Sequence, residues 1–183
     1  MRELDHLVVA ARTLDEGAAW VESKLGVAMA SGGKHPLMGT HNRLLKLDAG
    51  RFLEVIAIDP EAPAPSRPRW FELDTPAMRA RLAKGPALIH WVHRTDDLEH
   101  ALAGYPERVE ILSLSRGAYR WRMGVPPDGR LPASGTAPTL IQWDGPHPCD
   151  ALPESGCALT KFSAAQGALS AIFATPGGTR TIP

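Results

Sequence analysis

The chain has 183 residues, which is enough for one sizeable hydrophobic core but not for two large independent domains. Twenty basic and twenty acidic side chains give a formal net charge of zero, so the bulk charge provides no reason to expect a nucleic-acid or membrane partner. Seventeen prolines and seventeen glycines indicate many turns and argue against a helical bundle. We therefore expect a single unit that binds a small, neutral or weakly charged molecule.

No targeting or anchoring segment is expected. The apolar run near the N-terminus, inside "MRELDHLVVAARTLDE", is too short for the core of a signal peptide or for a membrane span. The two cysteines, Cys149 and Cys157, have no Cys-x-x-Cys spacing and no neighbouring ligand cluster, which is typical of reduced thiols. These features predict a soluble, cytoplasmic protein.

The first part of the chain, residues 1–60, predicts the order strand, helix, strand, strand, strand. After a strand over "LDHLVVA", Thr13 is suited to cap a helix, and Glu16 three residues later to close a capping box. That helix should end near Leu25, where Gly26 can adopt a left-handed cap. Three extended segments follow, and the last two, "THNRLLKL" and "RFLEVIAI", are expected to form a hairpin.

The same order returns in residues 86–147. A proline-rich connector over residues 61–85 contains one predicted helix, which Thr75 would cap. The strand "ALIHWVHR" then precedes a short helix capped by Asp96 and three strands that end with "TLIQW". Residues 148–183 predict a terminal hairpin of "CALTKF" and "ALSAIFA", followed by a loose tail, "TPGGTRTIP".

Two histidines support an internal duplication. His6 in "LDHLVVAA" and His90 in "LIHWVHR" each occupy the third place of a short apolar strand, 84 residues apart. Glu54 and Gln142, each a polar residue inside the last strand of its unit, are 88 residues apart, and the longer Pro/Gly loop of the second unit accommodates the difference. The chain therefore contains the same module twice.

Two such modules, each starting with a strand histidine and ending with a polar residue in an apolar strand, are the pattern of the vicinal oxygen chelate superfamily. Over roughly residues 4–147 the chain resembles its glyoxalase-like members, particularly in "LDHLVVAARTLDE", "GGKHPLMGTHNRLLKL" and "RFLEVIAIDP". The resemblance implies an α+β fold in which two βαβββ modules form an open, cleft-bearing barrel within one domain over residues 1–183. It also implies a divalent metal (Zn, Fe, Mn or Ni) bound by four residues: His6, Glu54, His90 and Gln142.

The residues themselves support a polar site at Glu54. In "RFLEVIAI" the strand period places Glu54 on one face with Phe52 and Ile56, where a bare carboxylate is costly unless it is paired or bound to a cation. Two imidazoles and one carboxylate leave positions open on a divalent metal for a chelating substrate. Gln142 stands where many catalytic relatives have glutamate, so it would be a neutral fourth ligand or bond a metal-bound water. Glu54 is thus the only obvious catalytic base.

Three further residues are predicted to contact the substrate. His41 and Arg43 in "GTHNR" could orient a carboxylate or carbonyl group, and Trp121 would line the cleft or the core between the modules. His35 and His41 flank "PLMGT", for which a flexible surface loop is expected and a lid or substrate-contacting edge is the alternative. His147, in a proline-rich loop, is expected to be a surface residue.

These features predict a glyoxalase-like metalloenzyme that chelates neighbouring oxygens of a small organic substrate. Lyase or isomerase chemistry is favoured, with an extradiol-type dioxygenase as a close alternative. A second alternative is a metal-free binding or resistance protein that sequesters a hydrophobic compound in the same cleft. The expected partner is a small molecule, without nucleic acid or membrane, and the protein could be a monomer or a homodimer.

Overall fold

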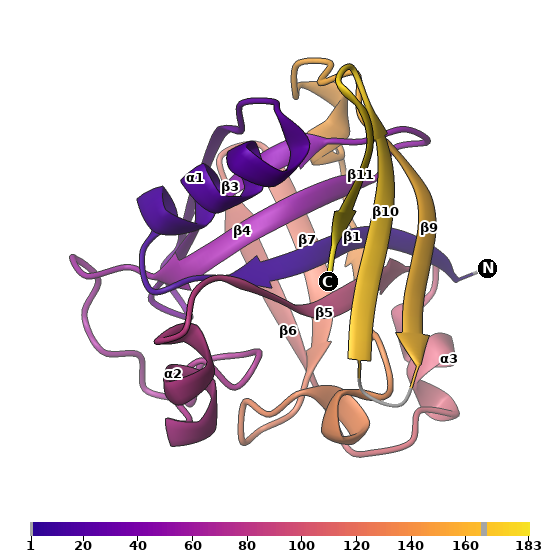
Figure 1. The fold of residues 1–183 in the computed structure, drawn as a ribbon. Coiled ribbons are helices and arrows are strands. Elements are labelled where there is room, and N and C mark those ends of the chain that lie inside the picture. Colours follow the sequence, from indigo (N-terminus) through magenta and orange to yellow (C-terminus); the bar gives the residue numbers. More distant parts are fainter. Residues whose placement is uncertain (1, 166–167) are drawn as a thin grey trace.

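A computed structural model describes residues 2–165 and 168–183 of the chain, which form a large curled sheet, a small sheet and three α-helices (Figure 1). In chain order the elements are β1 (Glu3–Ala10), α1 (Leu14–Leu25), β2 (Ala30–His35), β3 (Thr40–Lys46), β4 (Phe52–Ile58), α2 (Pro76–Leu82), β5 (Ala87–Arg94), α3 (Leu98–Ala103), β6 (Glu110–Arg116), β7 (Tyr119–Val125), β8 (Thr139–Trp143), β9 (Ala158–Ala165), β10 (Ala168–Thr175) and β11 (Gly178–Ile182). The order strand, helix, strand, strand, strand thus occurs twice, and the predicted α+β fold is confirmed.

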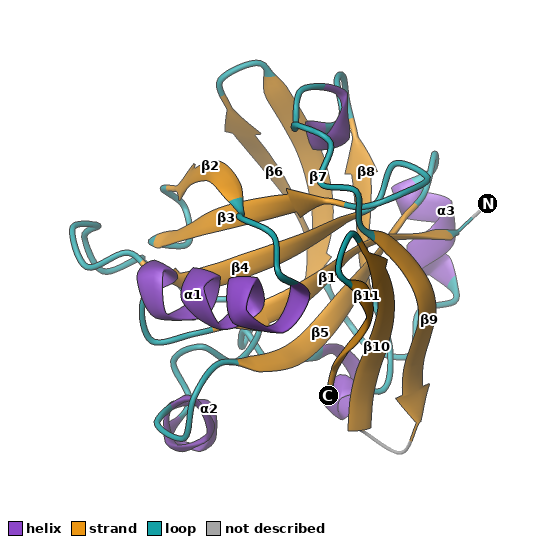
Figure 2. Ribbon diagram, turned by 45° about the horizontal axis from the view of Figure 1, so that its top comes forward, coloured by secondary structure: helices purple, strands orange, loops and turns teal. Residues whose placement is uncertain are grey.

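The large sheet joins the two repeats through their first strands. Its order is β2-β3-β4-β1-β5-β8-β7-β6, with β1 antiparallel to β5, β1 parallel to β4, and β5 parallel to β8. The outer strands β2 and β6 contact each other, so the sheet curls into an open barrel (Figure 2). The inner face of this curl forms the walls of a cleft.

Successive side chains of the central strands point to opposite faces of the large sheet, and this divides the core into two layers. In β1, Val8 and Ala10 belong to an inner cluster, whereas Leu7 and Val9 belong to an outer cluster that also contains buried residues of α1. His6 shares the parity of Val8, so its side chain belongs to the inner face. The cleft is therefore built on a strand that is buried on both sides.

Local signals set the limits of the first helix. Thr13 accepts a hydrogen bond from the Glu16 backbone N–H, and Gly26 has φ 74°, both as predicted for the ends of α1. The Glu16 carboxylate instead pairs with Arg12 at 2.8 Å. In α3 the cap is Asp97, whose side chain accepts from the His100 N–H, so the assignment to Asp96 was wrong by one residue.

The C-terminal segment is more ordered than the sequence suggests. Beyond the expected hairpin, β11 adds a third strand to a separate sheet of order β11-β10-β9, so the prediction of a loose tail was wrong. Ile182 is completely buried and joins Phe173 in the outer cluster, because this small sheet packs against the outer face of the large one (Figure 1). Within the described residues, no helix has the length and apolar character needed to cross a membrane.

Candidate functional site

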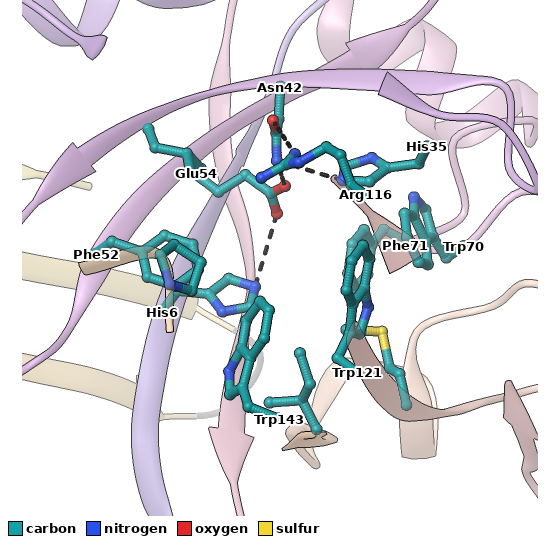
Figure 3. Close-up of a pocket in the computed structure, with 14 residues that line it drawn as sticks. His6, His35, Asn42, Phe52, Glu54, Trp70, Phe71, Arg116, Trp121 and Trp143 are labelled. Atoms are coloured by element: carbon teal, nitrogen blue, oxygen red, sulfur yellow. Dashed lines mark hydrogen bonds and ion pairs between the residues drawn. The ribbon is translucent and has the colours of Figure 1, made fainter. Parts of the chain in front are cut away.

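A cleft on the inner face of the large sheet gathers polar and aromatic side chains (Figure 3). The cavity itself is small, about 30 Å³, and the space within its walls measures about 420 Å³ when the part open to solvent is included. Its polar residues are His6, His35, Asn42, Glu54 and Arg116. Its aromatic residues are Phe52, Trp70, Phe71, Trp121 and Trp143. This combination of apolar walls and a few convergent polar groups is typical of a small-molecule site.

His6 is oriented by its neighbour in the sequence. His6 Nδ1–H donates to Asp5 Oδ1 over 2.6 Å, and Asp5 is completely buried. Burial raises the pKa of Asp5, but hydrogen bonds from His147 and His6 outweigh it and leave that pKa well below its usual range. An ionised carboxylate can only accept, so the proton of a neutral His6 is on Nδ1 and its Nε2 lone pair faces the cleft.

Asp5 itself accepts hydrogen bonds from two residues near the end of the second module, one in β8 and one in the loop that follows it. Trp143 Nε1–H and His147 Nε2–H donate to Asp5 Oδ2 over 3.0 and 3.1 Å. His147 Nδ1 in turn accepts from the Cys149 backbone N–H, an arrangement that places the ring proton on Nε2. The expectation that His147 is merely a surface residue was therefore wrong.

Glu54 faces His6 across a short gap. Its side chain is almost fully buried, and Oε2 lies 3.7 Å from His6 Nε2, too far for a hydrogen bond but within the range of an ion pair. Its other oxygen, Oε1, accepts from Asn42 Nδ2 over 2.7 Å. Phe52 stacks on the His6 ring, with the two ring centroids 4.4 Å apart. The imidazole of His6 and the carboxylate of Glu54 are therefore held side by side, with the lone pairs of Nε2 and Oε2 toward the cleft.

Asn42 links Glu54 to the opposite wall. Its Oδ1 accepts from the Gly33 N–H at 2.8 Å and from Arg116 Nη1 at 3.0 Å, so one amide connects β2, β3, β4 and β6. The approach is close, because a Cβ on Gly32 would lie 2.1 Å from Asn42 Oδ1 and one on Gly33 2.4 Å from Arg116 Cδ. The glycine pair in "GGKH" therefore permits this arrangement.

His35 completes the polar wall as a neutral ring. Burial, followed by the nearby Arg116 charge, lowers the pKa of His35 to about 3. Its Nδ1 lies 3.1 Å from Thr40 Oγ1, and Asn42 Nδ2 lies 3.4 Å from its Nε2. His35 ends β2 and His41 lies in β3, so these two histidines belong to strands and only residues 36–39 between them form a turn.

The sequence matches the family model of the glyoxalase-like domain over residues 4–174. The chain belongs to this family. The predicted resemblance to glyoxalase-like members of the vicinal oxygen chelate superfamily is thereby confirmed. No curated protein matches the sequence significantly.

Solved structures share the fold of this glyoxalase-like domain. A hypothetical protein from Staphylococcus aureus is 18% identical with a TM-score of 0.53, and the match covers 79% of this chain and 59% of that one. Methylmalonyl-CoA epimerase from Mycobacterium tuberculosis is 18% identical with a TM-score of 0.49, over 81% of this chain and 91% of that one. The chain thus spans little more than half of the Staphylococcus aureus protein.

Of the four predicted metal ligands, the structure brings together His6 and Glu54. The 3.7 Å between their facing atoms suits two ligands that each lie about 2.0–2.2 Å from one zinc ion. The other two side chains are engaged elsewhere: His90 Nε2 accepts from the Thr139 N–H at 3.1 Å, and Gln142 Oε1 accepts from the Leu98 N–H at 2.9 Å.

The donor set in this glyoxalase-like domain consequently does not fit a three-residue metal site. Residues 2–165 and 168–183 contain no group of three or more His, Cys, Asp or Glu side chains placed to hold a metal ion. His90 does not line the cleft, whereas Phe71 of the connector does, and the ring centroids of these two residues lie 5.4 Å apart. The four-ligand assignment stays a prediction.

Of the three predicted substrate contacts, one lies in the cleft and two point away from it. Trp121 lines the cleft. His41 and Arg43 alternate with Asn42 along β3 and therefore point to its other face, where Arg43 pairs with Asp15 of α1. Sequence reasoning missed Asn42 although it lies in the same "GTHNR" motif, because the strand register was not known.

Proposed function

We propose that this glyoxalase-like domain is an enzyme of the isomerase or lyase type that moves a proton on a small carbonyl compound bound in the cleft. The observation that carries the proposal is the pairing of an oriented imidazole with a fixed carboxylate. His6, held by Asp5 at 2.6 Å, and Glu54, held by Asn42 at 2.7 Å, present facing atoms 3.7 Å apart. Two proton-handling groups side by side are what a proton shift between neighbouring atoms requires.

The proposed step begins at a carbon next to the carbonyl group. The Glu54 carboxylate takes the proton from that carbon, and the electron pair of the C–H bond forms a C=C bond while the carbonyl oxygen becomes negative. His6, protonated at Nε2, gives its proton to that oxygen, and the buried Asp5 carboxylate stabilises the imidazolium before the transfer. Where the first carbon carries a hydroxyl group, loss of that hydroxyl proton to the base and return of a proton to the former carbonyl carbon yield the isomer. Departure of a β-substituent with the electron pair of its bond would instead give a lyase.

The surroundings favour such a transfer. Trp70, Phe71, Trp121 and Trp143 form walls that limit water, and charges interact more strongly in an environment of low dielectric constant. Asn42 keeps Glu54 in place through an amide hydrogen, a bond that a neutral glutamine could also accept. The substitution Glu54→Gln would therefore remove the base and keep the hydrogen bond to Asn42.

The test is exchange of carbon-bound hydrogen for deuterium in a panel of small 2-oxo and 2-hydroxy carbonyl compounds, followed by NMR in D2O. Wild-type protein should catalyse exchange next to the carbonyl, and Glu54→Gln should reduce the rate by about 10²- to 10⁴-fold. Glu61→Gln, an equal change at an exposed residue paired with Lys34, should have no effect. No exchange by the wild type with any compound, or an unchanged rate for Glu54→Gln, would refute the proposal.

The same assay separates this mechanism from the metalloenzyme predicted from sequence. Exchange should survive dialysis against a chelator, because the two facing donors, His6 and Glu54, have no third side chain to complete a ligand set within the described residues. Loss of exchange that a divalent ion restores would support the metal-dependent isomerase or extradiol-type enzyme instead. Both of these rest on the ligand set with His90.

A metal-free binding protein is the second candidate. The polar groups Glu54 and Asn42 are already bonded to each other, and the cleft walls are largely aromatic, which suits capture of an apolar compound. Binding of aromatic compounds that depends on Trp121, with no hydrogen exchange in any of them, would favour this candidate.

A further inference from the structure

Arg116 is the only arginine or lysine among the residues that line the cleft, within the described part of the chain. It ends β6, is half-buried, and reaches Asn42 of β3 beside His35 (Figure 3). Its one hydrogen bond to a described residue runs from Nη1 to Asn42 Oδ1 at 3.0 Å. That bond leaves Nε and Nη2, the edge with which a guanidinium group can bind both oxygens of a carboxylate, without a protein acceptor in these ranges.

The guanidinium carbon of Arg116 lies 5.7 Å from the centre of the Tyr119 ring, a contact that does not neutralise its charge. No acidic side chain of the described residues forms an ion pair with it, whereas Arg122 on the neighbouring strand pairs with Glu99. Asn42 stands between Arg116 and Glu54, the one carboxylate among the described residues of the cleft wall, and His35 beside it is a neutral ring. A half-buried cation that lacks a counter-ion in a pocket is a favourable site for an anion.

We infer that Arg116 binds the carboxylate of the substrate, and that the substrate is a small monocarboxylic acid with an aromatic or bulky apolar body. The inference rests on the proposed function and names its substrate class. The guanidinium would bind the acid through two parallel hydrogen bonds, a geometry that lysine cannot reproduce.

The position of Asn42 relates the anchor to the reacting carbon. One end of its amide bonds Arg116 and the other bonds Glu54, so the guanidinium that would hold the acid and the carboxylate that would act as base are both positioned by the same side chain. The rings of Trp121 and Trp143, with centroids 5.5 Å apart, are placed to pack against the body of the acid.

The experiment compares phenylacetate with phenylacetamide, which have nearly the same shape but differ in charge. Binding is measured by calorimetry and by tryptophan fluorescence on wild-type protein and on Glu54→Gln, so that no turnover is needed. Both proteins should prefer the acid by about tenfold, the size expected of a charge-assisted pair. Arg116→Gln should bind the two compounds equally, and Arg116→Lys should keep a reduced preference.

Arg120→Gln is the matched control. Arg120 lies on β7, is exposed, and donates only to the Ala118 carbonyl, so its loss removes the same charge without touching the cleft. The preference should be unchanged in this variant. Circular dichroism checks that each variant is folded, and the comparison of acid with amide on wild type and Arg116→Lys remains decisive if Arg116→Gln does not fold.

A preference that persists in Arg116→Gln, or the absence of any preference in the wild type, would overturn the inference. Failure of this inference can be distinguished from failure of the proposed function. If the acid is preferred through Arg116 but no carbonyl compound exchanges hydrogen, the anion site stands and the proton-transfer proposal falls. If exchange occurs equally well with neutral ketones and the substitution of Arg116 has no influence, the proton-transfer proposal stands and the anion site falls.

Discussion

Asp5 and His6 are adjacent in the sequence, yet their side chains meet at 2.6 Å. Successive residues of a regular strand point to opposite faces, so this contact requires an irregularity. The pairing of β1 with β5 shifts register between Leu4 and His6, which leaves Asp5 without a partner residue in that ladder. Such bulges re-aim side chains. Here one brings a buried carboxylate against the imidazole that faces the cleft.

Asp5→Asn tests the role of this contact. The amide can accept through one atom only, so it cannot receive hydrogen bonds from His6, Trp143 and His147 in the way that the carboxylate does. We expect hydrogen exchange to slow by about 10²-fold or more, because the imidazolium loses its counter-charge. Nitrogen NMR of the imidazole should show a changed tautomer of His6.

The control for this variant is Asp128→Asn, an exposed carboxylate that pairs with Arg130. It should leave both the exchange rate and the His6 spectrum as they are. Wild-type exchange in Asp5→Asn would mean that Asp5 has a structural role only.

Mild acid is expected to destabilise the fold through two buried histidines. Burial lowers the pKa of both His35 and His90 from 6.5 to about 3. As the pH falls below 6.5 the unfolded chain therefore binds protons that the folded chain does not, and the free energy of unfolding decreases, by up to about 1.4 kcal/mol per pH unit for each histidine. The decline should level off near pH 3 for these two groups.

Urea denaturation between pH 7 and about 5.5, where most carboxyl groups stay ionised, measures this slope. His90→Gln should make it shallower, whereas His100→Gln, on an exposed helix position, should not change it. A stability that is independent of pH in this range would contradict the burial of neutral imidazoles.

Gln142→Ala should affect stability and leave the cleft intact. Gln142 Oε1 accepts from the N–H of Leu98, a buried residue at the start of α3. Its removal leaves that N–H unpaired and should cost about 1–3 kcal/mol of unfolding free energy. Gln142→Glu retains an acceptor near a helix N-terminus and should restore most of the loss. If Gln142→Ala lowered metal content instead, the sequence-based ligand assignment would gain support.

Gly32→Ala should disturb the site through packing alone. The new Cβ would lie 2.1 Å from Asn42 Oδ1 and 2.3 Å from the Asn42 backbone oxygen, so Asn42 must move and release Glu54. We expect a loss of about 1–3 kcal/mol in stability together with slower hydrogen exchange. Gly104→Ala, where nothing lies within 4 Å of the added carbon, is the control and should behave as wild type. Thermal unfolding and the exchange assay distinguish the two.

The repeat and most of the elements follow from local sequence signals. Thr13 and Gly26 delimit α1 as expected, and the strand period correctly placed Glu54 on one face with Phe52 and Ile56. Each of these signals depends on residues close in the chain. The tail over 178–182 gave no such signal, because its order comes from pairing with β10 and from burial of Ile182.

The rest of the site could not be predicted from the sequence for specific reasons. The contact of Asp5 depends on a bulge, and that of His147 depends on a loop packing against β1 from more than a hundred residues away. His90 was assigned by symmetry with His6, but the connector places Phe71 against it. Symmetry of the backbone thus did not extend to the side chains, since the connector exists only once.

The two halves of the curled sheet consequently have different roles. The first half contributes the groups capable of acid–base chemistry, His6, Asn42 and Glu54, whereas the second contributes Arg116 and the indole rings of Trp121 and Trp143. Substitutions in β6–β8 could therefore retune which molecules are accepted while the reactive groups in β1–β4 stay intact. Because the two sets of residues lie in different halves of the sheet, the selectivity of the cleft can change while its reactive groups are conserved.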